Sequence, residues 1–277
     1  MITFAQGALL FTSAALAGAV NSVAGGGTLL TFPALYHVLN NPLVANATST
    51  VALWPGQLSS LFGYRKEIGE SQVAIKRLAV PSLVGGAIGA SLLLHTKPEV
   101  FATIVPYLIL LATTLFMLQE PLSRYLKKQK PATESADAPP STPEDSPARL
   151  ATVIGFQLMV AIYGGYFGAG IGILMLAALG FMGFSHIHRM NGIKNINGLL
   201  INMVAIGFFI FGHTKPGNGV GPHSNSLIDW PLALLMMAGS IVGGYTGAGI
   251  ARKIGQSNVR KAIIFIGFAL ALSLFRK

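Results

Sequence analysis

The sequence predicts an all-α integral membrane protein made of two inverted-topology repeats, with about five membrane-embedded helices in each. Composition is the first observation: 52% of the 277 residues are hydrophobic and 10% are charged, whereas a soluble domain carries about 25% charged residues. The second is a series of apolar segments that occurs twice along the chain, and the third is a glycine-rich break near the start of each series. Together these features indicate a duplicated membrane protein.

The first repeat is expected at residues 1–122, as an N-terminal transmembrane unit of five apolar segments. Its second segment holds about a dozen residues, fewer than the ~20 that a spanning helix needs, so we predict a half-helix or a re-entrant piece there. The third to fifth segments are long enough to cross. In order, the five segments cover residues 2–23, 28–39, 46–64, 78–95 and 100–119.

A polar linker is expected at residues 123–149. It is rich in proline, serine and charge and has no apolar period, a composition typical of disordered segments. Its lysines place it in the cytoplasm, because short loops rich in Lys and Arg face that side.

The second repeat is expected at residues 150–277 and repeats the same series. Its segments cover residues 150–167, 170–184, 191–212, 230–251 and 259–275. The glycine breaks align, Asn191 falls opposite Asn46, and Val242–Ala248 resembles Val84–Ala90. Such correspondence predicts gene duplication.

The basic loops give the two repeats opposite orientations. In the first repeat the basic loop follows the third segment, and in the second repeat it follows the fourth. The residues are Arg65, Lys66, Lys76 and Arg77 in the first loop, and Arg252, Lys253, Arg260 and Lys261 in the second. Because both loops should be cytoplasmic, equivalent segments run in opposite directions, as in many secondary transporters. The net charge of +10 is explained by these loops and does not indicate nucleic-acid binding.

The two glycine breaks are the first candidate binding site. Consecutive glycines at membrane depth expose backbone groups, which are tolerated only where protein or a polar cavity satisfies them. Helix N-termini that start at the breaks would attract an anion. The candidate residues are Asn21, Gly25, Gly26, Gly27 and Thr28 in the first break, and Gly168, Gly170 and Gly172 in the second. The alternative is that glycines only allow close helix packing, which we favour for the Gly85–Gly89 and Gly243–Gly247 pairs.

The polar starts of the two third segments are the second candidate. The residues are Asn46, Ser49 and Thr50 in the first repeat, and Asn191, Lys194 and Asn195 in the second. Lys194 stands opposite Ser49 and has no carboxylate near it in the sequence. A lysine in an apolar segment is costly unless it is paired or faces water, so its partner could be a substrate anion. Alternatively, Lys194 extends to the cytoplasmic headgroups.

The acidic residues narrow the substrate class. All nine lie in loops, in the linker or at segment ends, whereas a cation carrier normally buries an acid. An anion or a polar solute is therefore the better substrate. No metal site is expected, because His186 and His188 lack other ligands, and we expect no cofactor and no catalytic residue.

Both repeats resemble a known family. Ala17–Thr28, Pro33–Leu35 and Ala45–Ala52 are similar to the first-repeat signature of the TauE/SafE family of sulfite and organosulfonate exporters. Gly164–Gly172 and Asn191–Asn195 resemble its second-repeat pattern. The resemblance implies a multi-pass permease of the bacterial inner membrane that moves a small sulfur oxyanion or a sulfonate. The long polar linker is a departure from the family pattern.

We therefore expect a secondary transporter that exports a small sulfur-containing anion and is not an enzyme. Its expected partners are the substrate and the lipid bilayer, and a homodimer is compatible with the sequence. The coupling ion, such as a proton or sodium, is not readable from the residues. The alternatives are an anion channel and a membrane scaffold that transports nothing.

Overall fold

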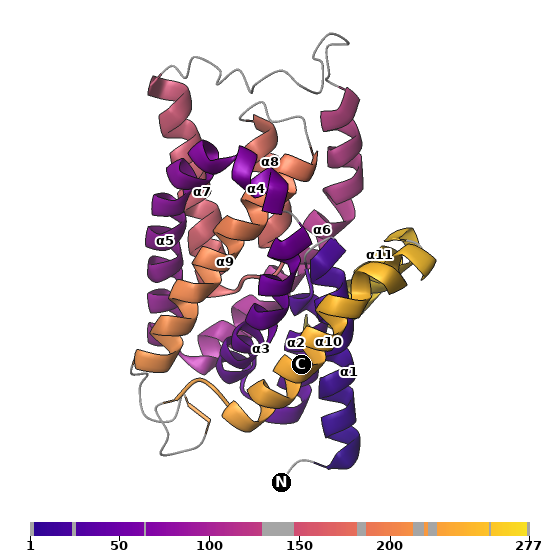
Figure 1. Cartoon of the computed structure of the whole chain (residues 1–277). Coiled ribbons are helices and arrows are strands. Elements are labelled where there is room, and N and C mark those ends of the chain that lie inside the picture. Colours follow the sequence, from indigo (N-terminus) through magenta and orange to yellow (C-terminus); the bar gives the residue numbers. More distant parts are fainter. Residues whose placement is uncertain are drawn as a thin grey trace.

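The computed structural model describes residues 3–23, 26–63, 65–128, 147–181, 187–212, 219–220, 226–254 and 256–275. These residues form helices and, among themselves, no strand (Figure 1). The helices are α1 (Phe4–Val23), α2 (Thr28–Leu39), α3 (Pro42–Gly63), α4 (Arg65–Glu70), α5 (Gln72–His95), α6 (Pro98–Lys128), α7 (Pro147–Tyr166), α8 (Ile171–Phe181), α9 (Ile187–Phe211), α10 (Trp230–Ile254) and α11 (Gln256–Phe275).

Four helices in the described part of the chain are long and apolar enough to cross a membrane. They cover Phe4–Asn21, Gln72–His95, Pro98–Leu118 and Arg189–Phe211. The prediction of an all-α membrane protein is therefore confirmed. The segment predicted to be too short to span is α2, with 12 residues, and its counterpart α8 is also short, with 11. At about 1.5 Å per residue, neither reaches across the ~30 Å of a hydrocarbon core.

Several helix ends follow from local sequence. Proline, which lacks an N–H and has φ preset for a helix, is the first residue of α3, α6 and α7. Asn40 ends α2 in the left-handed conformation, with φ 51°. The Asn41 side chain then accepts hydrogen bonds from the N–H groups of Leu43 and Val44, at 3.1 and 3.2 Å. This cap starts α3 about one turn before the apolar segment that the sequence indicated.

Two features were not predicted. The short helix α4 lies in the basic loop between α3 and α5. In addition, α6 continues to Lys128 and α7 begins at Pro147, so helix extends into both ends of the segment predicted as a linker. Leu122, Tyr125 and Leu126 continue the spacing of an apolar helix face into that segment. Residues 129–146 lie outside the described residues.

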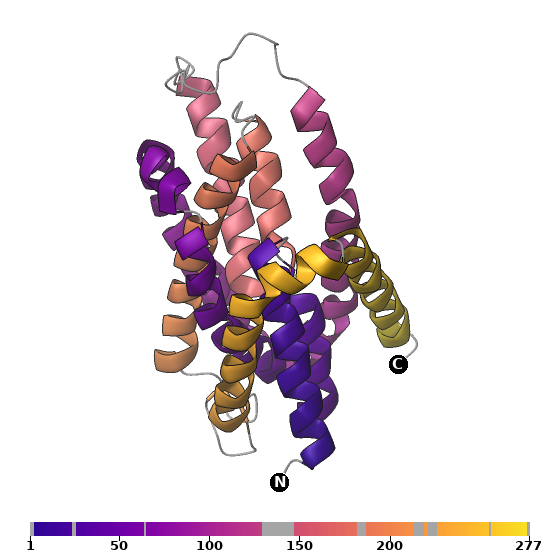
Figure 2. The ribbon, with the colours of Figure 1, turned by 45° about the vertical axis from the view of Figure 1, so that its right-hand side comes forward.

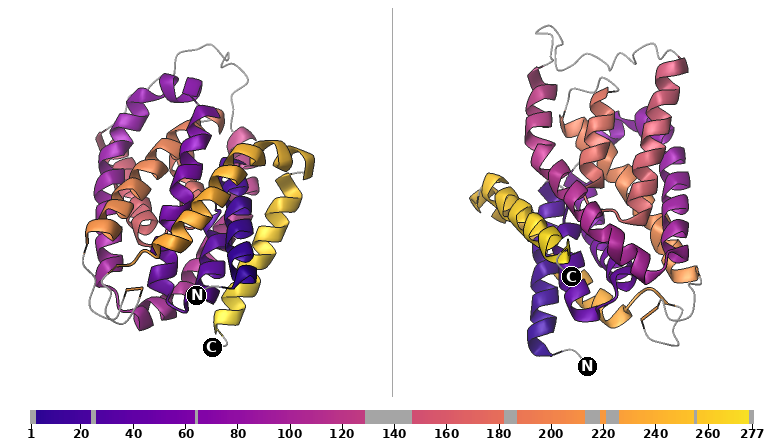
Figure 3. Two further views of the ribbon diagram at one scale, coloured as in Figure 1. Left: turned by 60° about the horizontal axis from the view of Figure 1, so that its bottom comes forward. Right: turned by 180° about the vertical axis from the view of Figure 1, so that it is seen from behind.

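The helices of one half pack mainly on helices of the other half. α1 lies along α10, α5 lies along α7 and α9, α3 lies along α10, and α6 lies along α11 (Figures 2 and 3). These contacts have counterparts: α1 on α10 corresponds to α7 on α5, and α3 on α10 corresponds to α9 on α5. The two halves therefore share one interlocked helix bundle.

Glycines permit the closest of these helix contacts. A methyl group at Gly89 of α5 would collide with the backbone oxygen of Ile162 in α7, and one at Gly243 of α10 would collide with that of Ala15 in α1. A methyl group at Gly85 would lie 2.7 Å from the oxygen of Leu158. The packing role predicted for Gly85, Gly89 and Gly243 is confirmed.

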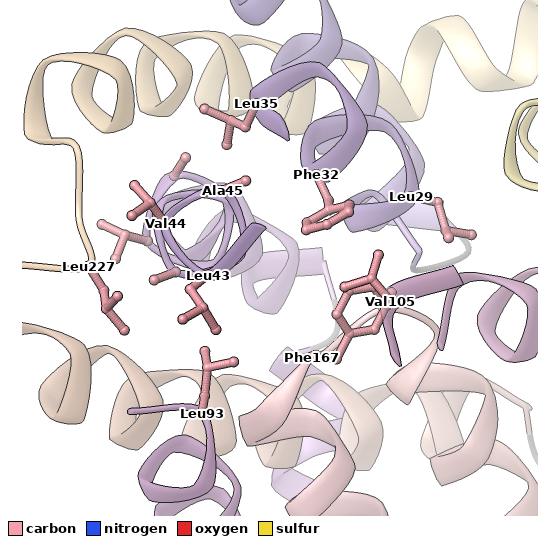
Figure 4. Packing of buried hydrophobic residues seen from close by; sticks show 14 of the residues in the cluster. Leu29, Phe32, Leu35, Leu43, Val44, Ala45, Leu93, Val105, Phe167 and Leu227 are labelled. Atoms are coloured by element: carbon pink, nitrogen blue, oxygen red, sulfur yellow. The ribbon is translucent and has the colours of Figure 1, made fainter. Parts of the chain in front are cut away.

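The short helix α2 lies inside the largest apolar cluster. Its buried Leu29, Phe32 and Leu35 are among the labelled side chains in Figure 4, as is Phe167 from the second half. The rings of Phe32 and Phe167 meet edge to face, with centroids 5.5 Å apart. Because α2 is anchored by residues of both halves, it holds the first glycine break at the centre of the bundle.

We predict that Gly89→Ala destabilises the protein by about 1–3 kcal/mol, because the added methyl group overpacks a backbone contact. Thermal unfolding of the purified protein in detergent measures the effect. Gly155→Ala is the matched control, since Gly155 lies on α7 with open space around it. Equal melting temperatures for the two variants would contradict the packing role.

Candidate binding cavity between the glycine breaks

A cavity of about 70 Å³ lies where the two glycine breaks meet. A single water needs roughly 10–15 Å³ of such space, so there is room for a small solute. Its lining comes from both halves of the chain: Asn21, Gly26, Thr28, Thr50, Leu53, Gln57, Gly168, Ile171, Gly172, Met175, Lys194, Asn195, Gly198 and Asn202.

The first break is closed by an asparagine from the helix before it. The Asn21 Oδ1 atom accepts a hydrogen bond from the N–H of Gly27, at 2.8 Å. Gly26 has φ 95°, a conformation that favours glycine. A methyl group at Gly27 would lie 2.6 Å from the backbone oxygen of Ala17, so α1 and the start of α2 touch there. Asn21 thereby gives the backbone N–H of Gly27 the hydrogen-bond acceptor that water would otherwise supply.

The second break is closed by a tyrosine. The N–H groups of Phe167 and Gly168 both donate to the carbonyl of Tyr163, at 2.9 and 3.2 Å. The Tyr163 hydroxyl donates to the carbonyl of Ala169, at 2.6 Å. Gly168 and Gly170 have φ values of 81° and 75°. This left-handed geometry ends α7 and turns the chain into α8.

Helix α6 lies against both breaks. A methyl group at Gly26 would lie 3.0 Å from the Phe116 ring, and one at Gly170 would lie 3.2 Å from the Cα of Ala112. Ala112 and Phe116 are four residues apart, so they lie on one face of α6. This face of α6 therefore supports both breaks.

Lys194 is the only charged residue among the described residues that line the cavity. Its side chain is 6% exposed and crosses the start of α8, where a methyl group at Gly172 would lie 3.2 Å from Cδ and 3.8 Å from Nζ. Among the described residues, no carboxylate pairs with Lys194 and no group hydrogen-bonds to it. The ammonium group is therefore available to an anion.

The start of α8 adds a backbone donor beside that lysine. The N–H groups of Ile171 and Ile173 donate to the carbonyls of Gly168 and Gly170. The N–H of Gly172 has no acceptor in the described part of the chain. Both this N–H and the positive end of the helix dipole favour negative charge.

Helices α3 and α9 contribute matching faces to the cavity. Thr50, Leu53 and Gln57 follow helical spacing on α3, and Asn195, Gly198 and Asn202 occupy the aligned positions on α9. The Asn202 amide donates to the Gln57 Oε1 atom, at 3.0 Å. The prediction omitted Gln57 and Asn202, although the repeat alignment pairs them as it pairs Asn46 with Asn191.

A buried polar network positions α9 from behind. The Gln157 amide of α7 donates to Ser82 of α5 at 2.8 Å, and Ser82 donates to the Oδ1 atom of Asn197 at 3.1 Å. The Asn197 amide donates to the Ile193 carbonyl at 2.9 Å. Asn197 lies three residues after Lys194, so the network helps to set the rotation of α9 about its axis.

Eight of the predicted site residues line this cavity: Asn21, Gly26, Thr28, Thr50, Gly168, Gly172, Lys194 and Asn195. Five others are described but do not line it: Gly27, Asn46, Ser49, Gly170 and Asn191. Gly25 lies outside the described residues.

Two of the non-lining residues have packing partners instead. Asn46 is buried, and its amide donates to the Tyr166 carbonyl at the end of α7, at 3.0 Å. Ser49 is buried, and its hydroxyl lies 2.6 Å from that of Thr31 in α2. Both side chains connect α3 to the two breaks.

Comparison with known proteins adds a family and several relatives. Residues 10–274 match the family model described as Sulfite exporter TauE/SafE. A "Probable membrane transporter protein" of Haemophilus influenzae is 24% identical over 96% of this chain and 93% of its own length. "Probable membrane transporter protein YfcA" of Escherichia coli K12 is 26% identical, covering 96% and 88%. "Probable membrane transporter protein ORF9" of Sinorhizobium sp. is 27% identical, covering 96% and 91%. No solved structure matches the chain.

We predict that Asn46→Ala lowers the free energy of unfolding by about 1–3 kcal/mol, because it leaves the partly buried Tyr166 carbonyl without its donor. Asn195→Ala should change it by less than about 0.5 kcal/mol, since Asn195 lines the cavity and makes no hydrogen bond to another described side chain. Thermal or denaturant unfolding in detergent compares the two variants. The opposite order of stabilities would contradict this division of roles.

Proposed function

Because the chain belongs to the TauE/SafE sulfite exporter family, we propose that it is a secondary transporter that moves a small sulfur-containing anion across the bacterial inner membrane. Sulfite and small organosulfonates are the proposed substrates. The full-length relatives are named as probable membrane transporters, and membrane transport is the part of this function that the family supports directly. Beyond membrane transport, we propose the substrate class, a small sulfur-containing anion, and the direction of transport, which is export.

The observation that carries the proposal is the unpaired Lys194 beside the start of α8. Lys194 is buried, lines the cavity and has no acidic partner among the described residues. An ammonium group and a helix N-terminus both bind an oxyanion through charge and N–H donors. Thr50 and Asn195 add a hydroxyl and an amide at the cavity, which can replace part of the water that the anion loses.

The arrangement of the helices supports an inverted repeat. In Figure 1, α1 begins at the bottom and α7 begins at the top. The end of α3 and the start of α9 lie together at α4, where the Arg189 Nε atom is 3.2 Å from the Glu70 carboxylate. This arrangement is the one expected if equivalent helices run in opposite directions, and the basic residues around α4 support a cytoplasmic position for that end.

Alternating access would follow from the same arrangement. The cavity is lined by aligned positions of the two repeats, the place where inverted-repeat transporters hold their substrates. A movement of one repeat against the other would expose these residues to each side in turn. The Gln57–Asn202 hydrogen bond directly links α3 to α9, so it would have to lengthen or rearrange in that movement.

We predict that sulfite, sulfoacetate, taurine or thiosulfate at millimolar concentration raises the melting temperature of the purified protein, because a ligand that binds only the folded state stabilises it. Lys194→Gln should weaken the affinity for the stabilising compound by at least ~10-fold, since a hydrogen bond to a charged group contributes about 1.5–3 kcal/mol. Lys76→Gln is the control, because Lys76 is exposed and far from the lining set.

The result has clear alternatives. No shift with any of the four compounds would refute the substrate class. A shift that survives Lys194→Gln and disappears in Lys76→Gln would move the site to the basic loop. Substrate flux in proteoliposomes that saturates with concentration supports a carrier, whereas single-channel conductance would favour the channel.

A further inference from the structure

Resting on the proposed function, we propose that this transporter works as an anion exchanger: it reorients with an anion bound beside Lys194 and does not return across the membrane with the cavity empty. The coupling partner is then a second anion, and neither a proton nor a sodium ion is required. The inference rests on the position of the Lys194 ammonium group in the cavity and on the positions of the described acidic side chains, none of which neutralises it.

Among the side chains that the structure describes, the charge of the cavity has no built-in counter-ion. The acidic residues with described side chains are Glu67, Glu70, Glu99 and Asp229, and none of them lines the cavity. Glu70 pairs with Arg189, and the Asp229 carboxylate accepts a hydrogen bond from the N–H of Leu232 at the start of α10. With Lys194 protonated, the empty cavity therefore carries a net positive charge.

The helix beside Lys194 increases that charge imbalance. The side chain crosses Gly172 at the start of α8, and the N-terminal end of a helix carries a partial positive charge. Like charges in a site of low dielectric repel each other strongly. An anion between Lys194 and the N–H of Gly172 would convert this repulsion into two attractions, so binding should stabilise the closed cavity far more than it would at a neutral site.

The first repeat shows what a neutral version of the same position looks like. Ser49 is aligned with Lys194, is fully buried, and hydrogen-bonds with Thr31 at 2.6 Å. The positive charge is thus present on only one side of the repeat axis. One fixed charge matches one monovalent anion per cycle, such as hydrogensulfite or a monosulfonate, and the loaded cavity is then electrically neutral.

Net charge decides which form of the cavity can move. During alternating access the cavity must pass through a state closed to both sides, where water no longer screens it. An unpaired charge is expensive there, whereas a compensated pair costs much less. The empty carrier is consequently trapped on whichever side it released its anion, until another anion binds.

Counterflow in proteoliposomes tests the inference. Wild-type protein is reconstituted into vesicles that contain either unlabelled sulfite or gluconate, a larger anion without a sulfur oxyanion group, at equal ionic strength and pH. Uptake of radiolabelled sulfite is then measured, with the membrane potential clamped. We expect the initial rate to be at least ~10-fold higher with internal sulfite, because each factor of ten requires only about 1.4 kcal/mol of barrier difference.

Lys194→Ser gives the second arm, because it installs the residue of the aligned position. This variant should bind sulfite more weakly, and its remaining uptake at saturating sulfite should lose its dependence on internal sulfite. Lys76→Gln should behave as wild type does in both vesicle types. Melting temperatures of both variants show whether they are folded before reconstitution.

Each outcome decides a separate claim. Equal uptake into both vesicle types would overturn exchange while leaving sulfite transport intact. Uptake into gluconate vesicles that an imposed pH gradient restores to the exchange rate would overturn it in favour of a return step with deprotonated Lys194. No uptake into either type, together with no sulfite-dependent thermal shift, would instead refute the proposed substrate.

Discussion

The structure depends on how two breaks in the helical backbone are satisfied without water. In hydrocarbon, an open N–H or C=O group costs several kcal/mol, so a glycine break at the centre of a bundle needs internal partners. Asn21 supplies an acceptor to Gly27 in the first break, and Tyr163 supplies a donor to Ala169 in the second. With these bonds made, α2 and α8 can begin inside the protein and direct their N-terminal ends toward one cavity.

Close helix packing makes this arrangement rigid. Glycines of α5 and α10 allow backbone contact with α7 and α1, so each half is held mainly by helices of the other. α6 then contacts both breaks through one face. These contacts position the cavity walls in this arrangement of the helices, as a site that replaces the hydration of an ion requires.

The two halves have diverged where chemistry is proposed. Two aligned pairs are polar in both halves: Thr50 is aligned with Asn195, and Gln57 with Asn202. All four residues line the cavity. At Ser49 and Lys194 they differ: the serine is used in packing against α2, whereas the lysine remains unpaired in the cavity. In the proposed duplication, the paired positions account for the shape of the cavity, and the difference between Ser49 and Lys194 accounts for its charge.

The amino-acid sequence by itself determined the membrane class, the apolar segments, the short length of α2, the packing glycines and the family. These properties follow from hydropathy, from helix length and from the backbone freedom of glycine. Each of these can be read from a short stretch of sequence without knowing its neighbours in space. The sequence also indicated Lys194, because a charge in an apolar segment is conspicuous without any knowledge of its neighbours.

Only the tertiary structure decided which polar side chains reach the cavity. Asn46 and Thr50 are four residues apart and looked equivalent, yet Asn46 bonds to the end of α7 while Thr50 lines the cavity. Gln57 and Asn202 reach it and were not predicted. The reason is that the rotation of α3 and α9 about their axes is set by α2, α5 and α7, through contacts such as Ser49–Thr31 and Ser82–Asn197, and helical spacing alone carries no information about that rotation.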